Sequence, residues 1–246
     1  MFSFLKKQSP SQSRFQNLKR DIHSHILPGI DDGSPDVETS LTLVRGLIDL
    51  GITETVATPH IIGDLYRNNK ESINQALQKL SAACEEFELQ IKITAAAEYM
   101  LDDYFMDLLR KKEGLLTIAK NYILTELTYT TMPESLEDMS FEINTSGYQP
   151  IMAHPERYLF YHKNYDQFYR LKELGFLLQV NLLSVTGYYG PGVAKAAKFI
   201  LEKGLADYVG TDMHHQRHLN MLSNKNTLSI IHKLLGDKMY NDFDVA

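Results

Sequence analysis

The chain has 246 residues, of which 43% are hydrophobic and 23% charged, a composition typical of a globular protein. The formal net charge of -6 argues against a nucleic-acid groove as the main surface, and no apolar run approaches the roughly 18 residues that a membrane span needs. The single cysteine, Cys84, excludes an intramolecular disulfide and a cysteine-rich zinc site. We therefore expect a cytoplasmic protein that binds no nucleic acid and does not span a membrane.

The N-terminus lacks the apolar core of a secretory signal, because Lys6 and Lys7 interrupt its first apolar residues. Residues 8–17 are rich in serine and glutamine. We expect residues 1–19 to form a mobile leader. Residues 20–246 are long enough to bury one core, so we expect them to form a single domain.

Signals for helices and strands alternate along the chain. Ser34 is a candidate helix N-cap and Pro35 a first helical residue, and apolar residues then recur at helical spacing up to Gly51. Residues 52–60 are β-prone, and the helix that follows presents an apolar stripe that includes Cys84. The later elements are predicted strands at 91–98, 122–126, 150–154, 176–181 and 206–210, and predicted helices at 101–112, 133–144, 165–174 and 193–203.

This alternation predicts an α/β protein whose parallel strands close into a barrel. Strand and helix repeat about seven times, and the connections are short enough for right-handed parallel crossovers. In such barrels the carboxyl ends of the strands share one rim, so side chains far apart in the sequence meet there. Eight potential metal ligands fall at the ends of predicted strands: His23, His25, His60, Glu98, Glu126, His154, Asp212 and His214.

The pair His23 and His25 indicates a metal site. In an extended strand both residues point to the same face, so both imidazoles can reach one cation. A single histidine or carboxylate at a strand end is more often a hydrogen-bonded or solvated loop residue, but eight in one topological place favour metal binding. The mixture of imidazoles and carboxylates suits Mn, Fe or Zn better than Mg or Ca. The donors outnumber the needs of one ion, which favours two or three ions bridged by a carboxylate.

Sites with several metal ions hydrolyse phosphate esters, and the sequence favours this chemistry. Arg157 follows His154 closely, where it either grips phosphate oxygens or forms an ion pair with an acid such as Glu156. A cysteine-dependent phosphatase is excluded, because it requires an arginine six residues after its cysteine, and the residue six positions after Cys84 is Gln90. The chain also lacks the Gly-rich phosphate loop of a kinase or NTPase.

Six motifs together resemble those of the polymerase and histidinol phosphatase (PHP) family. They are His23-Ser24-His25, Gly29-Ile30-Asp31-Asp32-Gly33, Thr58-Pro59-His60, Ala153-His154-Pro155-Glu156-Arg157, Gln179-Val180-Asn181 with Thr186-Gly187, and Thr211-Asp212-Met213-His214. Within this family the chain is most similar to the manganese-dependent bacterial protein-tyrosine phosphatases associated with capsule and exopolysaccharide synthesis. The similarity extends over residues 20–220 and lies in the ordered set of motifs.

The resemblance implies a distorted, TIM-like (β/α)7 barrel that binds three metal ions. Manganese is the implied metal, with Fe, Co or Zn as alternatives. The implied ligands are His23, His25, Glu98 and Asp212 for one ion, Glu98, Glu126 and His154 for a second, and Asp32, His60 and His214 for a third. Asp32 enters only through the resemblance, because it lies in a loop, where its charge could instead serve a helix N-terminus.

Two arginines acquire roles from the same resemblance. Arg157 is expected to bind the substrate phosphate, and Arg217 occupies the place of a second arginine after the last histidine. Arg217 stands closer to His214 than the second arginine does in the family. The stretch Ala95-Ala96-Ala97 before Glu98 also departs from the polar form of the Gram-positive members, which suggests a different branch.

The implied reaction is the hydrolysis of phosphotyrosine by in-line attack of a metal-bridging hydroxide. The implied partner is a phosphotyrosine protein, the tail of a bacterial tyrosine kinase that controls capsule synthesis. One alternative is a phosphomonoesterase that acts on a small molecule such as histidinol phosphate. A second alternative is a non-catalytic module that binds a phosphorylated partner. The sequence does not indicate an oligomeric state.

Overall fold

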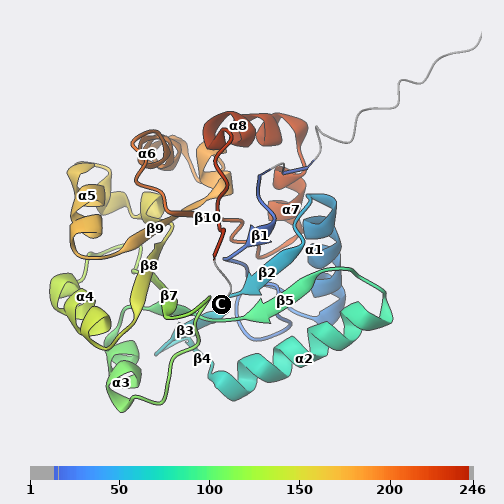
Figure 1. The fold of residues 1–246 in the computed structure, drawn as a ribbon, viewed down its shortest axis with the longest axis horizontal. Coiled ribbons are helices and arrows are strands. Elements are labelled where there is room, and N and C mark those ends of the chain that lie inside the picture. Colours follow the sequence, from blue (N-terminus) through green and yellow to red (C-terminus); the bar gives the residue numbers. More distant parts are fainter. Residues whose placement is uncertain (1–13, 16, 244–246) are drawn as a thin grey trace, which may run out of the picture.

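Strands form a ring at the centre of the molecule, and helices surround it (Figure 1). The computed structural model describes residues 14–15 and 17–243. The strands are β1 (Arg20–Asp21), β2 (Glu54–Ala57), β3 (His60–Ile62), β4 (Tyr66–Arg67), β5 (Lys92–Ala95), β6 (Glu98–Met100), β7 (Tyr122–Glu126), β8 (Gln149–Ala153), β9 (Leu177–Asn181) and β10 (Tyr208–Gly210).

Helices follow most of the strands and cover the outside of the ring (Figure 1). The α-helices are α1 (Val37–Asp49), α2 (Lys70–Glu86), α3 (Asp103–Lys111), α4 (Leu136–Thr145), α5 (Asp166–Glu173), α6 (Pro191–Glu202), α7 (Gln216–Leu222) and α8 (Lys225–Leu235). The short 3₁₀ helices of the described residues are η2 (Pro155–Arg157), η3 (Leu159–Tyr161) and η4 (Leu182–Thr186). None of the described helices is long and apolar enough to cross a membrane.

Two of the predicted strands are each broken in the middle. The predicted strand 52–60 contains β2 and the first residue of β3, and the predicted strand 91–98 contains β5 and the first residue of β6. The pairing of Ala57 with Ala95 continues, at the same offset, as the pairing of His60 with Glu98. Both halves therefore belong to one bent ladder, which is interrupted beside Pro59, a residue that has no N–H to donate.

Hydrogen bonds divide the strands into the sheets β1-β2-β5 and β10-β9-β8-β7-β6-β3-β4, in which all pairs except β3 and β4 are parallel. The ring closes beyond β10, where Ser24 forms a parallel bridge with Met213. The N–H of Asp212 donates to His23 O at 2.8 Å, and the N–H of His25 donates to Met213 O at 2.8 Å. The predicted fold class, a distorted α/β barrel, is confirmed.

The barrel interior is filled below the rim by apolar side chains. Residues alternate along β7, so that Leu124 shares its face with Glu126 while Ile123 points to the helices. Leu124 packs with Ile151 and Ala153 in a small buried cluster that is separate from the main core between ring and helices. Close-packed apolar side chains inside the ring therefore lie directly below the carboxyl ends of the strands.

The chain before residue 20 already packs on the domain. Phe15 and Leu18 are buried, and the N–H of Phe15 donates to Leu50 O. The packed domain thus begins before the predicted boundary at residue 20, because two apolar side chains of the predicted leader find core positions. The rest of that leader, residues 1–13 and 16, lies outside the described residues.

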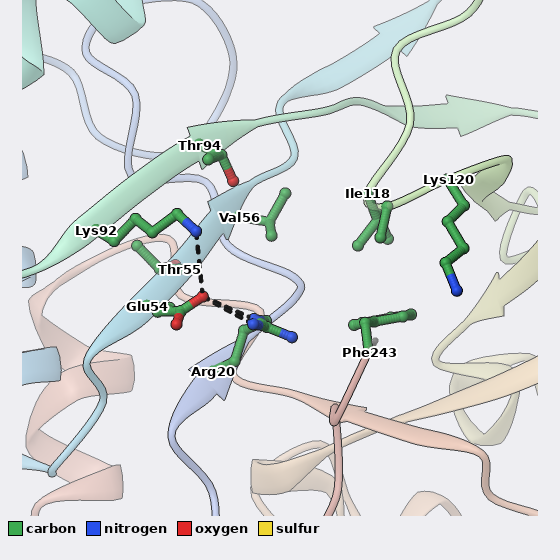
Figure 2. A pocket seen from close by; sticks show the side chains of 10 residues that line it. Arg20, Glu54, Thr55, Val56, Lys92, Thr94, Ile118, Lys120 and Phe243 are labelled. Carbon is green, nitrogen blue, oxygen red and sulfur yellow. Dashed lines mark hydrogen bonds and ion pairs between the residues drawn. The ribbon is translucent and has the colours of Figure 1, made fainter. Parts of the chain in front are cut away.

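A small cavity of about 150 Å³ lies at the opposite, amino-terminal end of the ring (Figure 2). Arg20 donates to Glu54 from Nε at 3.0 Å and from Nη2 at 2.9 Å, and Lys92 Nζ lies 3.8 Å from the same carboxylate. The ring of Phe243 also lines this cavity and stacks on Tyr208 at 4.7 Å. In parallel barrels this end serves stability, and its ion pairs fit that role.

One side chain from the C-terminal segment joins the first and last strands. The amide Nδ2 of Asn241 donates to Arg20 O at 2.8 Å and to Val209 O at 2.7 Å, and its Oδ1 accepts from the N–H of Val209 at 3.1 Å. Asn241 has a φ of 61°, a left-handed conformation that asparagine tolerates better than most residues. It therefore takes the place of the missing backbone pairing between β1 and β10.

Replacement of this bridge should destabilise the fold. Asn241→Ala removes three hydrogen bonds and leaves buried backbone groups without partners, so we expect the free energy of unfolding in urea to fall by about 3 kcal/mol. Asn74→Ala, at an exposed position of α2, should change it by less than about 0.5 kcal/mol. Equal urea midpoints for Asn241→Ala and the wild type would show that the bridge adds no stability.

Candidate metal centre

The carboxyl ends of the strands bring nine imidazole and carboxylate side chains to one place. The two histidines after β1 have fully buried side chains, and their Nε2 atoms lie 3.2 Å apart. This proximity follows from the extended backbone, which turns His23 and His25 to the same face. All nine predicted ligands take part in groups of donor atoms that lie within 4.8 Å of one another: His23, His25, Asp32, His60, Glu98, Glu126, His154, Asp212 and His214.

Glu98 lies at the centre of this cluster. Its Oε2 is 3.3 Å from Nε2 of His23, 3.3 Å from Nε2 of His25 and 3.2 Å from Nδ1 of His60. Its Oε1 is 3.2 Å from Nε2 of His154. One carboxylate therefore contacts four imidazoles from three different parts of the ring.

His60 connects the buried part of the cluster with its open side. Its Nδ1 lies 2.9 Å from Oε1 of Glu126, and its Nε2 lies 3.4 Å from Oδ1 of Asp32. The same oxygen of Asp32 lies 3.7 Å from Nε2 of His214. The side chain of Asp32 is 53% exposed, whereas that of Glu126 is 2% exposed, so the cluster opens to solvent on the Asp32 side.

Two of the donor residues have a backbone conformation that is rare for their type. His154 has a φ of 35° and Asp212 a φ of 51°, both in the left-handed region. Each residue directly follows a strand or lies within two residues of its end. Strain of this kind costs about 1–3 kcal/mol per residue and is typical of functional sites, because it turns a side chain in a direction that a regular strand does not allow.

Residues outside the predicted set hold the histidine rings in place. Oδ2 of Asp31 lies 2.8 Å from Nδ1 of His25, and Oε1 of Gln179 lies 2.7 Å from Nδ1 of His23. These contacts leave the Nε2 atoms of both rings facing Glu98, as expected for carboxylate and amide partners of metal-binding histidines. The motifs around Asp31 and Gln179 contain both residues, but sequence reasoning gave them no role. The alternation of Gln179 and Asn181 along β9 is the signal that places Gln179 inside the ring.

Burial and close charges shift the pKa values of the cluster in opposite directions. Burial and the charge of Glu98 raise the pKa of Glu126 to about 7. Burial works against a charged ring in His60, but Asp32, Glu126 and Glu98 raise its pKa to about 12. Burial lowers the pKa of His154 to about 4. The buried cluster thus contains both charged and neutral donors.

The donor set fits divalent cations. Both oxygens of Glu98 are buried and have no hydrogen-bond partner among the described residues. A buried carboxylate without such partners is costly unless a cation or an equivalent charge compensates it. The groups that could hold an ion are His23, His25 and Glu98; His23, His154 and Asp212; His60, Glu98 and Glu126; and His25, Asp32, His60 and His214. These groups overlap, and they join His60 to Glu126 and His154 to His23, whereas the three sets that the resemblance implies share only Glu98.

The two predicted arginines lie in different surroundings. Arg157 lines the cavity above the cluster, and its Nη1 donates to Oδ2 of Asp212 at 2.8 Å. Arg217 is exposed on α7 and is not among the residues that line the cavity. The structure thus brings Arg157 but not Arg217 to the cavity, because His215 and His218 line it while Arg217, between them, is exposed. A phosphate-binding role for Arg217 stays a prediction.

The cavity above the cluster has a volume of about 610 Å³. Its wall is aromatic and apolar, with Leu65 and Tyr66 from the β3–β4 hairpin and Tyr129 from the loop after β7. Leu65 is 73% exposed and Tyr129 is 42% exposed. The donor cluster therefore lies at the base of an open cavity with an apolar rim.

The described cysteine has no part in this site. Cys84 lies on the buried face of α2, as the apolar stripe predicted. Burial raises the pKa of its thiol, which disfavours the nucleophilic thiolate.

Comparison with known proteins gives consistent results. Tyrosine-protein phosphatase YwqE of Bacillus subtilis is 27% identical over 219 residues, which cover 89% of this chain and 86% of that protein. Tyrosine-protein phosphatase CpsB of Streptococcus pneumoniae is 28% identical over 202 residues, which cover 79% of this chain and 82% of that protein. This chain also matches a solved structure described as crystal structures of YwqE and CpsB, unique metal-dependent tyrosine phosphatases. The two structures superpose with a TM-score of 0.80 at 27% identity, and the match covers 89% of each chain.

A histidinol phosphate phosphatase from Lactococcus lactis shares the fold, with a TM-score of 0.53 at 15% identity over 88% of this chain and 94% of that one. A distorted parallel barrel with clustered imidazoles and carboxylates at its carboxyl rim defines a PHP-type protein. The chain belongs to the family described as capsular polysaccharide synthesis, CpsB/CapC, whose model matches residues 19–244.

Metal binding should release protons. Despite burial and the charge of His60, the carboxylate of Asp31 raises the pKa of His25 to about 10, and that of His60 is raised to about 12. Both rings are thus protonated near neutral pH without metal and must lose a proton to bind one. We expect Mn²⁺ affinity to rise between about pH 6 and pH 8, with proton release seen as different calorimetric heats in buffers of different ionisation enthalpy.

The variant His60→Asn supplies the control for this titration. It removes the ring with the more strongly raised pKa and should release fewer protons for each Mn²⁺ bound. Equal heats in both buffers for the wild-type protein would contradict the protonated state of the two histidines.

Proposed function

We propose that this protein is a metal-dependent phosphatase that hydrolyses phosphotyrosine in proteins. The observation that carries the proposal is the convergence of nine imidazole and carboxylate side chains at the base of one cavity that Arg157 also lines. Membership of the CpsB/CapC family and the similarity to YwqE and CpsB support it. Every ligand position that the motifs imply is occupied, which argues against a non-catalytic binding module.

The proposed cofactor is Mn²⁺, with three ions held by the nine clustered donors. Glu98 is the proposed bridging ligand, because it contacts histidines from several parts of the ring. The overlap of the candidate donor groups at His23, His25, His60 and Glu98 supports more than one ion. Bound divalent cations lower the pKa of water and neutralise charge on phosphoryl oxygens, which is the chemistry that phosphate ester hydrolysis requires.

The protein's own residues orient the ester for this reaction. Arg157 uses one N–H for Asp212 and has further donors in its planar fork, which can bind phosphoryl oxygens. Asn181 Nδ2 donates to the same oxygen of Asp212 at 2.7 Å, so this carboxylate is held from two sides with its other oxygen toward the histidines. A phenolate leaving group has a pKa near 10 and needs less protonation than an alkoxide, so a dedicated acid is not required.

The open apolar rim favours a protein substrate over a small metabolite. Leu65 and Tyr129 line the cavity, and Leu65 is largely and Tyr129 partly exposed, so a polypeptide that presents a phosphotyrosine can contact them. We further propose that the substrate is a bacterial tyrosine kinase in capsule or exopolysaccharide synthesis and that the reaction takes place in the cytoplasm. The family description supports the first proposal, and the charge and composition support the second.

Substrate class tests the proposed function. We expect the Mn²⁺-loaded protein to hydrolyse a phosphotyrosine peptide at least about tenfold faster, by kcat/KM, than a phosphoserine peptide or histidinol phosphate, because of its apolar rim and the better leaving group. Metal content is measured on the same sample, and a chelator should abolish activity. His154→Ala should lose activity and metal. A preference for histidinol phosphate would make the protein a small-molecule phosphomonoesterase.

The two arginines should differ in their effect on this activity. Arg157→Ala removes charged donors beside the reacting group, so kcat/KM for the phosphotyrosine peptide should fall by about 10²–10³-fold. Arg217→Ala removes an exposed side chain away from the cavity and should change kcat/KM by less than about twofold. A large loss of activity in Arg217→Ala would restore the role implied by the resemblance.

A further inference from the structure

Two tyrosine rings from distant loops meet on the side chain of Arg157. The guanidinium carbon of Arg157 lies 4.8 Å from the ring centroid of Tyr129 and 4.4 Å from that of Tyr189. Tyr129 follows β7, and Tyr189 lies in the loop between η4 and α6. Both distances are well within the range of favourable cation–π contact.

Hydrogen bonds alone do not fix the guanidinium. Among the described residues its side chain makes one hydrogen bond, from Nη1 to Oδ2 of Asp212, although a guanidinium carries five N–H donors. A single bond leaves the group free to turn about that contact. The ring faces restrict this rotation, because a cation prefers to lie over the face of an aromatic ring.

Other contacts hold both rings in place. Tyr129 stacks on the ring of His154 with centroids 5.9 Å apart and an angle of 23° between planes. The ring of Tyr189 packs edge-to-face against the rings of Tyr188 at 4.9 Å and His218 at 6.1 Å, contacts that a phenylalanine would keep. The loop that carries Tyr189 is bounded by Gly187 with a φ of 85° and Gly190 with a φ of 105°, conformations that favour glycine and permit a tight loop.

We propose that Tyr129 and Tyr189 are positioning residues, which hold Arg157 with its unbonded N–H edge beside the metal-ligand cluster, ready for a phosphoryl group. The proposal rests on the proposed function in one respect, which is that the anion bound by Arg157 is a phosphoryl group. The proposal also gives His218 of α7 a role, because His218 lines the cavity and contacts Tyr189.

The first experiment measures binding of inorganic phosphate to the Mn²⁺-loaded full-length protein by calorimetry. Tyr189→Leu and Tyr129→Leu should each weaken phosphate binding about tenfold, whereas Tyr189→Phe and Tyr129→Phe, which keep the ring, should stay within about twofold of the wild type. Phe141→Leu, an equal loss of an aromatic ring at a 72% exposed position of α4, is the matched control. Metal content and thermal midpoint are recorded for each sample.

A double-mutant cycle tests whether the rings act through Arg157. In the Arg157→Ala background, Tyr189→Leu should have no further effect on phosphate affinity, since the side chain that it positions is absent. On the phosphotyrosine peptide, Tyr189→Leu should raise KM about tenfold with a smaller change in kcat. If Tyr189→Leu lowers the thermal midpoint, Tyr189→Met, which keeps the volume without the ring, replaces it.

Four results would overturn the proposal. They are no binding of phosphate by the wild-type protein, unchanged phosphate affinity in both leucine variants, losses that add independently to that of Arg157→Ala, and losses that follow a drop in metal content. Failure of the proposed function gives a different result, because a protein without activity on phosphotyrosine can still show the ring-dependent phosphate affinity.

Discussion

The structure of the site depends on one buried negative charge. Glu98 lies where four histidines from three segments of the ring converge, and burial alone would raise the pKa of its carboxyl. The charge of His23 and the imidazoles around it lower that pKa well below its usual value. The carboxylate and the rings are therefore mutually dependent, and the barrel supplies the rigid frame that keeps them within contact distance.

Much of the fold could be predicted from the sequence, because the alternation of β-prone runs and amphipathic helices is strong. The positions of α1, β7, β8 and β9 agree with the predicted ranges within a few residues. Pro59 signals a break in the strand predicted over residues 52–60, but the course of the chain beyond it was harder to foresee. His60 starts a short strand rather than ending a long one. Long-range pairing with β6 sets that geometry, and local sequence signals do not report it.

Most of the donor residues could be identified because histidines and carboxylates recur at the ends of successive predicted strands, a pattern that metal binding explains better than chance. Their grouping could not be predicted, since distances across a ring depend on strand tilt and side-chain rotamers. Arg217 illustrates the limit of a motif: the resemblance suggested a role although its spacing from His214 departs from the family, and in the structure Arg217 is exposed on α7. The support from Asp31 and Gln179 likewise depends on contacts across the barrel.

Close packing between the last and first strands leaves no room for a side chain at residue 210. A Cβ on Gly210 would lie 2.7 Å from Cβ of His23 and 2.9 Å from Nε2 of Gln179. A glycine on β10 therefore lets the last strand approach the first one closely enough to bring Asp212 beside His23. The distance of 3.2 Å between Oδ1 of Asp212 and Nε2 of His23 depends on this approach.

The bridge made by Asn241 also bears on how the protein is made in the cell. It joins residues separated by 221 positions, since its amide bonds to Arg20. Ribosomes add about 5–20 residues per second, and domains fold as their chains emerge. This ring cannot be sealed until nearly all of its sequence has left the exit tunnel. Nascent chains therefore carry the early histidines for many seconds before Asp212 and His214 reach them.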